Sequence, residues 1–131
     1  MFPVLPWFYL LAGATLLGID GLYFYNDCLM GVQNGVNPQR VIRLRLVKDL
    51  KRVERCEVLE ANNPLFDEPT LGALVNEYFY FIANSQWGLV DEKGQLGPAE
   101  KLADPIILKI KCEQLRDTAG VRELCVRSWL Y

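Results

Sequence analysis

Residues 2–25 of the chain read FPVLPWFYLLAGATLLGIDGLYFY, and this stretch decides the predicted fold. It contains one charged residue, Asp20, and residues 1–19 carry no charge of either sign. An α-helix rises about 1.5 Å per residue, so a helix over residues 6–25 would be about 30 Å long, the thickness of a bilayer's hydrocarbon core. We therefore predict a single N-terminal transmembrane α-helix within residues 1–30.

Aromatic clusters at residues 7–9 and 23–25 support this prediction, because such rings favour the two headgroup interfaces. A cleaved signal peptide would carry basic residues before the apolar run, and none is present. A buried helix would seldom be uncharged over 19 residues, and a helix lying in the interface needs a strongly polar face. The segment is therefore expected to stay in the mature chain and to cross the membrane.

Four residues of this helix are candidates for contacts inside the membrane. Ala14, Gly18 and Gly21 share one side of a helix, where small side chains let a neighbouring helix approach closely. Asp20 lies about 7 Å inside the second aromatic cluster. An intramembrane carboxylate is a candidate for partner binding or proton transfer. The favoured interpretation is a polar group at headgroup depth, solvated or bound to a neighbouring subunit.

The basic residues of the chain are concentrated after this span. Residues 31–60 are predicted to form a connector and a basic amphipathic helix, with Asn37 as N-cap and Pro38 in the first turn. The segment 37–60 has a net charge of +3, which suits either anionic phospholipids such as cardiolipin or an acidic partner. The alternation in residues 43–46 leaves a short strand open. The candidate lipid or partner contacts are Arg40, Arg43, Arg45, Lys48, Lys51, Arg52 and Arg55.

The remainder, residues 61–131, has a net charge of −3 and is predicted to be a small extramembrane α+β region. Apolar residues at helical spacing predict a helix over residues 70–83, and residues 87–96 predict a hairpin of two short strands. Residues 104–115 fit a strand or a helix, and a last helix is expected to start at residue 117 or 118. The predicted fold is a membrane protein with one transmembrane helix and a mainly α extramembrane region that includes a short β-hairpin.

The composition argues against catalysis and cofactor binding. The chain of 131 residues has no histidine, which excludes His-containing catalytic triads and metal sites. The four cysteines fit no metal-binding spacing, and a Cys112–Cys125 disulfide is left open. No nucleotide-binding glycine loop is present, and a pI near 5.2 argues against binding nucleic acid. We therefore expect no catalytic, cofactor-binding or metal-binding residues.

The first half of the chain shows a set of features that belong together in one family. They are Pro6, an apolar span with Gly13 and Gly18, Tyr23 or Tyr25 at its exit, Gly31, and the charged stretch 49–52. Over roughly its first 55 residues the chain resembles the MWFE-type accessory subunit (alpha subcomplex subunit 1) of mitochondrial NADH:ubiquinone oxidoreductase, respiratory complex I. The family's Tyr-His-Trp segment is absent here, and the family has no counterpart to residues 61–131.

The resemblance implies a non-catalytic accessory subunit that stabilises assembly of the membrane arm. Its partners would be other subunits of a large membrane complex and phospholipids. The implied location is the mitochondrial inner membrane, and the positive-inside bias places the C-terminal region on the matrix side. Three alternatives stay open. One is a single-span subunit of another respiratory complex or of the ATP synthase, and another is a signal-anchored soluble enzyme or binding module. The third is a peripheral lipid-binding scaffold that uses the basic helix of residues 40–55.

Overall fold

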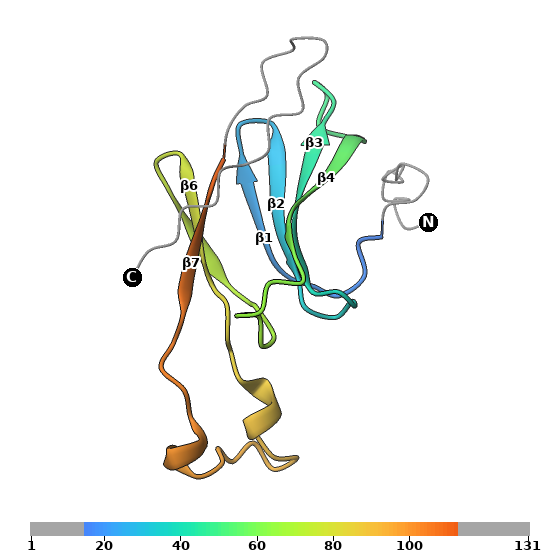
Figure 1. The fold of residues 1–131 in the computed structure, drawn as a ribbon. Helices are drawn as coiled ribbons and strands as arrows, with labels where there is room; N and C mark the ends of the chain where they lie inside the picture. Colours follow the sequence, from blue (N-terminus) through green and yellow to red (C-terminus); the bar gives the residue numbers. More distant parts are fainter. Residues whose placement is uncertain (1–14, 113–131) are drawn as a thin grey trace, which may run out of the picture.

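The computed structural model describes residues 15–112, and it builds them from β-strands and two short 3₁₀ helices (Figure 1). Four antiparallel strands follow one another in a first sheet, sheet I, and three more form a second, sheet II. The strands of sheet I are β1 (Ile19–Tyr25), β2 (Cys28–Gln33), β3 (Arg40–Leu46) and β4 (Val53–Ala61). Those of sheet II are β5 (Gly72–Val75), β6 (Tyr78–Ile82) and β7 (Ile107–Lys111).

The predicted transmembrane helix is wrong over its second half, which forms β1. Asn26 and Asp27 both have positive φ, 45° and 59°, and join β1 to β2 through a two-residue turn. Turns of this kind match the twist of an antiparallel pair and favour Asn, so the hairpin signal overrides the apolar run. Within residues 15–112 no helix is long and apolar enough to cross a membrane. Residues 1–14 of the predicted span lie outside the described part.

The predicted basic helix is also wrong, because its residues form β3 and β4. Ile42, Leu44 and Leu46 alternate with more polar residues, and this period of two places them together on one face of the sheet. The strand that the sequence left open at residues 43–46 is therefore the second half of β3, which pairs with β4 in a hairpin. Pro38 lies in the loop before β3, where the Asn37–Pro38 peptide bond is cis, rather than in the first turn of a helix.

The C-terminal predictions have mixed outcomes. The helix over residues 70–83 is wrong, since this segment folds into the β5–β6 hairpin. The strand alternative for residues 104–115 agrees with β7. The predicted hairpin at 87–96 is reduced to a single bridge between Val90 and Leu96, beside the 3₁₀ helix η1 (Trp87–Leu89). The predicted last helix lies outside the described residues.

The hydrophobic core lies between the two sheets. One face of sheet I, which we call its front face, carries Met30, Val32 and Val41 and packs against Phe79 and Phe81 of sheet II. The opposite, back face of sheet I holds a second cluster, formed by Ile42, Leu44, Leu46 and Val53. Sheet I therefore has apolar residues on both faces, which is unusual for an antiparallel sheet with one solvated side.

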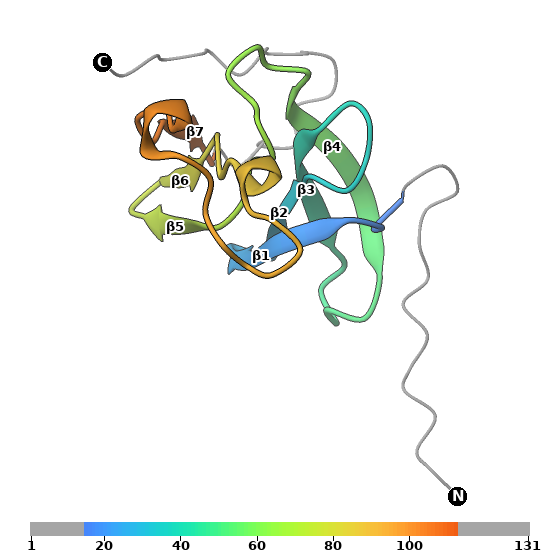
Figure 2. The ribbon, with the colours of Figure 1, turned by 90° about the horizontal axis from the view of Figure 1, so that it is seen from below.

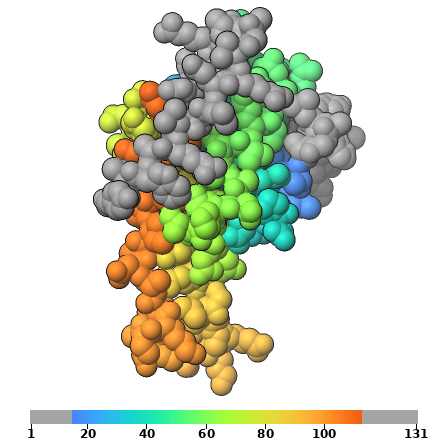
Figure 3. All heavy atoms as spheres, in the orientation of Figure 1, coloured from blue at the N-terminus to red at the C-terminus, as the bar shows by residue number. Residues whose placement is uncertain are grey.

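The two sheets lie side by side, with β1 next to β5 (Figure 2). A long connection, residues 83–106, joins β6 to β7 and projects beyond the sheets as a separate lobe (Figure 3). It contains η1 and the 3₁₀ helix η2 (Ala99–Lys101). The amide side chains of Asn84 and Gln86 close its base through hydrogen bonds to residues 103–106.

Candidate functional site

Polar loops gather at one end of sheet I, where β2 joins β3 and β4 leads into sheet II. The loop 34–39 and the loop 62–71 enclose a hollow of about 220 Å³. Its lining consists of Val36, Asn37, Gln39, Asn62, Asn63 and Phe66. Four of these six side chains are neutral amides and none is charged, so the hollow offers both donors and acceptors without a net charge.

Gln39 holds the two loops together. Its Oε1 accepts from the backbone N–H of Glu68 at 3.2 Å, and its carbonyl oxygen accepts from the N–H of Asn62 at 3.1 Å. Its Nε2 donates to the carbonyl of Asn34 at 3.4 Å. The Gln39 amide is therefore committed to the scaffold, and it positions the hollow rather than offering free hydrogen bonds to a ligand.

The remaining amides keep hydrogen-bonding capacity. Asn63 is buried, and its Oδ1 accepts from the N–H of Leu65 at 2.9 Å, which leaves its NH₂ group as a donor. Asn37 and Asn62 are exposed, and their side chains make no hydrogen bond to any residue in 15–112. Phe66 adds an aromatic wall, and its ring also packs edge-on against Phe81 at 6.0 Å. The hollow therefore combines free amides with one rigid apolar side.

Glu68 places a further polar group at this end of the molecule. Its carbonyl accepts from Ser85 Oγ at 2.7 Å, and its backbone is left-handed with φ 55°. The carboxylate oxygen Oε2 is buried and has no hydrogen-bond partner among the described residues. Burying a charged oxygen without a partner costs free energy, so Glu68 is a strained feature of the same loop.

Asp20 belongs to this polar end and not to a membrane span. It lies on β1 and is exposed, and its Oδ2 accepts from Thr70 Oγ1 and, at 3.1 Å, from Asn34 Nδ2. The hydroxyl oxygen of Tyr23, on the same strand, accepts a hydrogen bond from the N–H of Gly72 at 2.8 Å. These contacts connect β1 to the start of sheet II, so the Asp20 carboxylate helps to hold the two sheets together.

The small residues predicted to pack helices have other roles. Gly18 has φ 67° and lies against Gly35, whose N–H donates to the Gly18 carbonyl at 3.2 Å. A Cβ on Gly18 would lie 2.6 Å from Gly35 Cα, so the close approach of two loops requires glycine. Gly21 is buried within β1 beside the Tyr23 ring. Ala14 lies outside the described residues.

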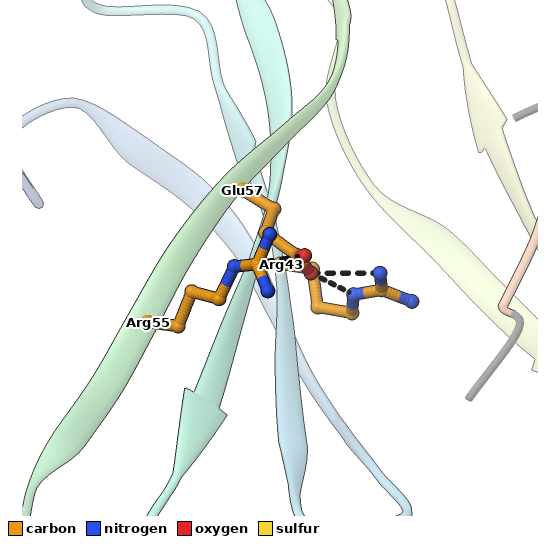
Figure 4. Close-up of polar contacts among 3 residues, drawn as sticks. All are labelled: Arg43, Arg55 and Glu57. Atoms are coloured by element: carbon orange, nitrogen blue, oxygen red, sulfur yellow. Dashed lines mark hydrogen bonds and ion pairs between the residues drawn. The ribbon is translucent and has the colours of Figure 1, made fainter. Parts of the chain in front are cut away.

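The seven basic candidates do not form one continuous face. Arg43 is buried on the front face, and its guanidinium lies 2.7 Å from a carboxylate oxygen of Glu57 on β4 (Figure 4). Arg55 approaches the other oxygen of Glu57 at 3.2 Å. Arg40 Nε donates to Gln33 Oε1 at 2.7 Å. Arg45 lies on β3, whereas Lys48, Lys51 and Arg52 lie in the turn before β4.

The cysteines form no metal site in the described region. Across residues 15–112 no group of three or more His, Cys, Asp or Glu side chains is close enough to hold a metal ion. Burial raises the pKa of the Cys28 thiol, although nearby Arg43 and Arg45 act in the opposite direction. Burial also raises the pKa of Cys56. Both thiols are therefore poor nucleophiles near neutral pH.

The sequence-based search overlooked the amides because it looked for charged and metal-binding groups. Residues 31–38 (GVQNGVNP) belong to the predicted connector, and residues 61–69 (ANNPLFDEP) open the predicted C-terminal region. Their signal was the repeated asparagine beside proline in two separate loops, which only the antiparallel pairing of β3 with β4 brings together.

Comparison with known proteins adds no further identification. No protein-family model matches the chain, and no curated protein or solved structure matches it either.

Proposed function

We propose that the chain is a binding module for a small neutral polyhydroxylated molecule, a sugar or polyol, held in the hollow between the loops 34–39 and 62–71. The observation that carries the proposal is the lining: amides and an aromatic ring, with no charged side chain. A hydroxyl group both donates and accepts, as an amide does, so each free amide can satisfy it. A strongly charged ligand would meet no counter-charge in this lining.

The size of the hollow supports a small ligand. Its volume of 220 Å³ is below the 300–1,000 Å³ range of drug-sized pockets. A monosaccharide that displaced the water of the hollow would regain hydrogen bonds from Asn37, Asn62 and Asn63. The hollow is open to solvent on one side, so we expect weak binding, with a Kd of about 1 mM.

This proposal develops the binding-module alternative and replaces the membrane-subunit hypothesis. The accessory-subunit hypothesis depended on an N-terminal helix, and β1 and β2 occupy the second half of that helix and the residues after it. Placement in the mitochondrial inner membrane depended on the same helix, so it forms no part of the proposal.

The test is a titration of the ¹⁵N-labelled chain with D-glucose, followed by NMR of the side-chain NH₂ signals. We expect saturable shifts of the Asn62 and Asn63 signals, and weaker or no shifts with glucose 6-phosphate. Asn62→Gly should abolish the shifts at Asn63. Asn76→Gly is the matched control. Asn76 is also an exposed asparagine, and its φ of 54° is close to the 51° of Asn62. It lies in the turn between β5 and β6 and does not line the hollow. Glucose shifts that are absent, or equal in both variants, would contradict the proposal.

A further inference from the structure

The three strands of sheet II repeat the arrangement of the first three strands of sheet I. In each, the first two strands are joined by a two-residue turn that consists of Asn and an acidic residue, Asn26–Asp27 in sheet I and Asn76–Glu77 in sheet II. Counting from these turns, Cys28 corresponds to Tyr78 as the first residue of the second strand. The sheets can therefore be compared residue by residue through their pairing registers.

The third strands confirm the correspondence. Met30 pairs with Arg43 and the corresponding Tyr80 pairs with Lys109, so a basic residue occupies the same position in both sheets. The next such position also matches, because Cys28 pairs with Arg45 and Tyr78 pairs with Lys111. A β-branched pair follows in each: Val32 with Val41, and Ile82 with Ile107.

The contact between the repeats joins unlike faces. The front face of sheet I carries Met30 and Val32, whose counterparts in sheet II are Tyr80 and Ile82. The face of sheet II that meets it instead carries Phe79 and Phe81, the counterparts of back-face residues in sheet I. The packing is therefore front to back. This contact uses the front face of sheet I and the back face of sheet II. The back face of sheet I and the front face of sheet II therefore have no sheet packed against them within residues 15–112.

Both of these faces expose apolar side chains. On the back face of sheet I, Leu22, Phe24 and Val58 are each at least 51% exposed and flank the buried Ile42. On the front face of sheet II, Val75 and Ile107 are about half exposed. Phe24 corresponds to Leu74 of sheet II, which packs into the core between the sheets. The structure therefore shows directly what covers a back face: the front face of another unit.

We propose that copies of this chain associate front to back, with the front face of sheet II in one copy covering the back face of sheet I in the next. Because the contact is heterologous, it repeats from copy to copy and forms a ring when the rotation between units closes. Antiparallel sheets arranged around an axis are the blades of a β-propeller, which closes with four to eight blades, typically of four strands each. Sheet I has four strands, and sheet II has three within residues 15–112. Each copy supplies two units, so two, three or four copies complete the ring.

The arrangement of the two sheets fits this geometry. The first strands, β1 and β5, lie next to each other, while β4 and β7 lie on the far side (Figure 2). Blades of a propeller converge in the same way at their first strands. The hydrogen bond from Gly72 N–H to the Tyr23 hydroxyl fixes this approach.

The test uses the full chain in analytical ultracentrifugation, with one charge placed on each face. Wild type should sediment as a closed oligomer of two to four copies, whereas Phe24→Asp and Ile107→Asp should each be monomeric. Mixing the two variants should give a one-to-one dimer and nothing larger, because each retains one intact face. Leu96→Asp is the control, since Leu96 is 58% exposed but lies in the lobe of residues 83–106.

Circular dichroism of each variant would verify the strand content before sedimentation. A wild type that stays monomeric up to the solubility limit overturns the proposal. An oligomer that survives both face variants, or variants that cannot complement each other when mixed, also overturns it, because the contact would then be isologous or located elsewhere.

Discussion

Sheet I and sheet II each carry a basic residue at the same position of the third strand, but different side chains surround it. At corresponding positions sheet I buries Arg43 against Glu57, whereas sheet II places Lys109 over the Tyr78 ring at 4.9 Å. Glu57 comes from β4, the fourth strand, so the buried cation and its counter-charge depend on each other. The comparison of Arg43 with Lys109 indicates that a basic residue on the third strand is buried where the fourth strand supplies a carboxylate.

A second difference concerns aromatic content. Sheet II has Phe79 and Phe81 on the face that meets sheet I, with ring centroids 5.6 Å apart, and Tyr23 of β1 lies 5.1 Å from Phe79. The corresponding residues of sheet I are Leu29 and Gly31. The contact between the sheets is therefore dominated by the rings of β6, and the stability of the molecule should be most sensitive there.

The largest expected effect is that of Phe79→Ala. Phe79 is fully buried, so removing its ring should lower the free energy of unfolding by about 3–5 kcal/mol. Leu29→Ala is the matched change in sheet I, and it should cost well under half as much because Leu29 is only half-buried. Urea denaturation of both variants measures the difference. Equal losses would contradict the unequal roles of the two positions.

The next effect is that of Arg43→Met, which leaves the exposed Arg55 as the one ion-pair partner of Glu57 within residues 15–112. Removing one member of a buried ion pair costs about 3 kcal/mol. Replacing both residues, Arg43→Met with Glu57→Leu, should recover most of the loss, because no uncompensated charge remains.

Lys109→Met is the matched change in sheet II and should cost under about 1 kcal/mol, the size of a cation–π contact at a partly exposed site. Thermal unfolding of the wild type, Arg43→Met, the double variant and Lys109→Met measures these losses of stability. A double variant as unstable as Arg43→Met alone would show that the arginine stabilises by more than charge pairing.

The sequence predicted a connector before residue 37, but it missed the turns at residues 47–52 and 76–77 because the predicted helices ran through them. The strand alternation at residues 43–46 and the strand alternative near Leu108 and Ile110 were visible locally, and both agree with the structure. Residues 19–25 were assigned to a helix because apolar residues continue on both faces of β1. A strand that carries apolar residues on both faces has no alternation of polarity to reveal its period.

The candidate site could not be predicted for a different reason. Asn37 and Asn62 are 25 positions apart, and their proximity depends on the register of β3 with β4, including the irregularity between Val41 and Ile42. Without a correct strand assignment no such register exists. The buried pair of Arg43 and Glu57 was hidden for the same reason, since the helix prediction assigned Arg43 to lipid or partner contacts and gave Glu57 no role.

A smaller loss of stability is expected at a position where the two sheets place a large and a small residue in opposite order on paired strands. Leu22 pairs with Gly31 in sheet I, whereas the corresponding pair in sheet II is Gly72 with Phe81. A Cβ on Gly72 would lie 2.1 Å from the Tyr80 carbonyl oxygen and 2.8 Å from the Phe79 ring. Gly72→Ala should therefore cost about 1–3 kcal/mol through overpacking.

Gly88→Ala is the control for this change, because no atom lies within 4 Å of the added Cβ. It should leave the urea midpoint unchanged. If Gly72→Ala behaved like Gly88→Ala, the two hairpins would not differ in packing as their sequences indicate.

The smallest expected effect is a dependence of the free energy of unfolding on pH that comes from Cys28 of sheet I. Cys28 opens β2 and has a thiol pKa raised by burial, while its counterpart in sheet II is a tyrosine. The unfolded chain releases the thiol proton near pH 8.5, and the folded chain releases it only at higher pH. Between the two values the unfolded state binds fewer protons, so the free energy of unfolding falls as pH rises.

The Cys28→Ala variant should be less stable at every pH, because a buried side chain is shortened. Its additional loss between pH 8 and pH 10 should nevertheless be smaller than that of the wild type, since one contribution to the slope is gone. Urea midpoints across this range measure the two slopes. Because a cavity changes the level of stability but not its pH slope, parallel curves would mean that the Cys28 thiol titrates alike in the folded and unfolded chains.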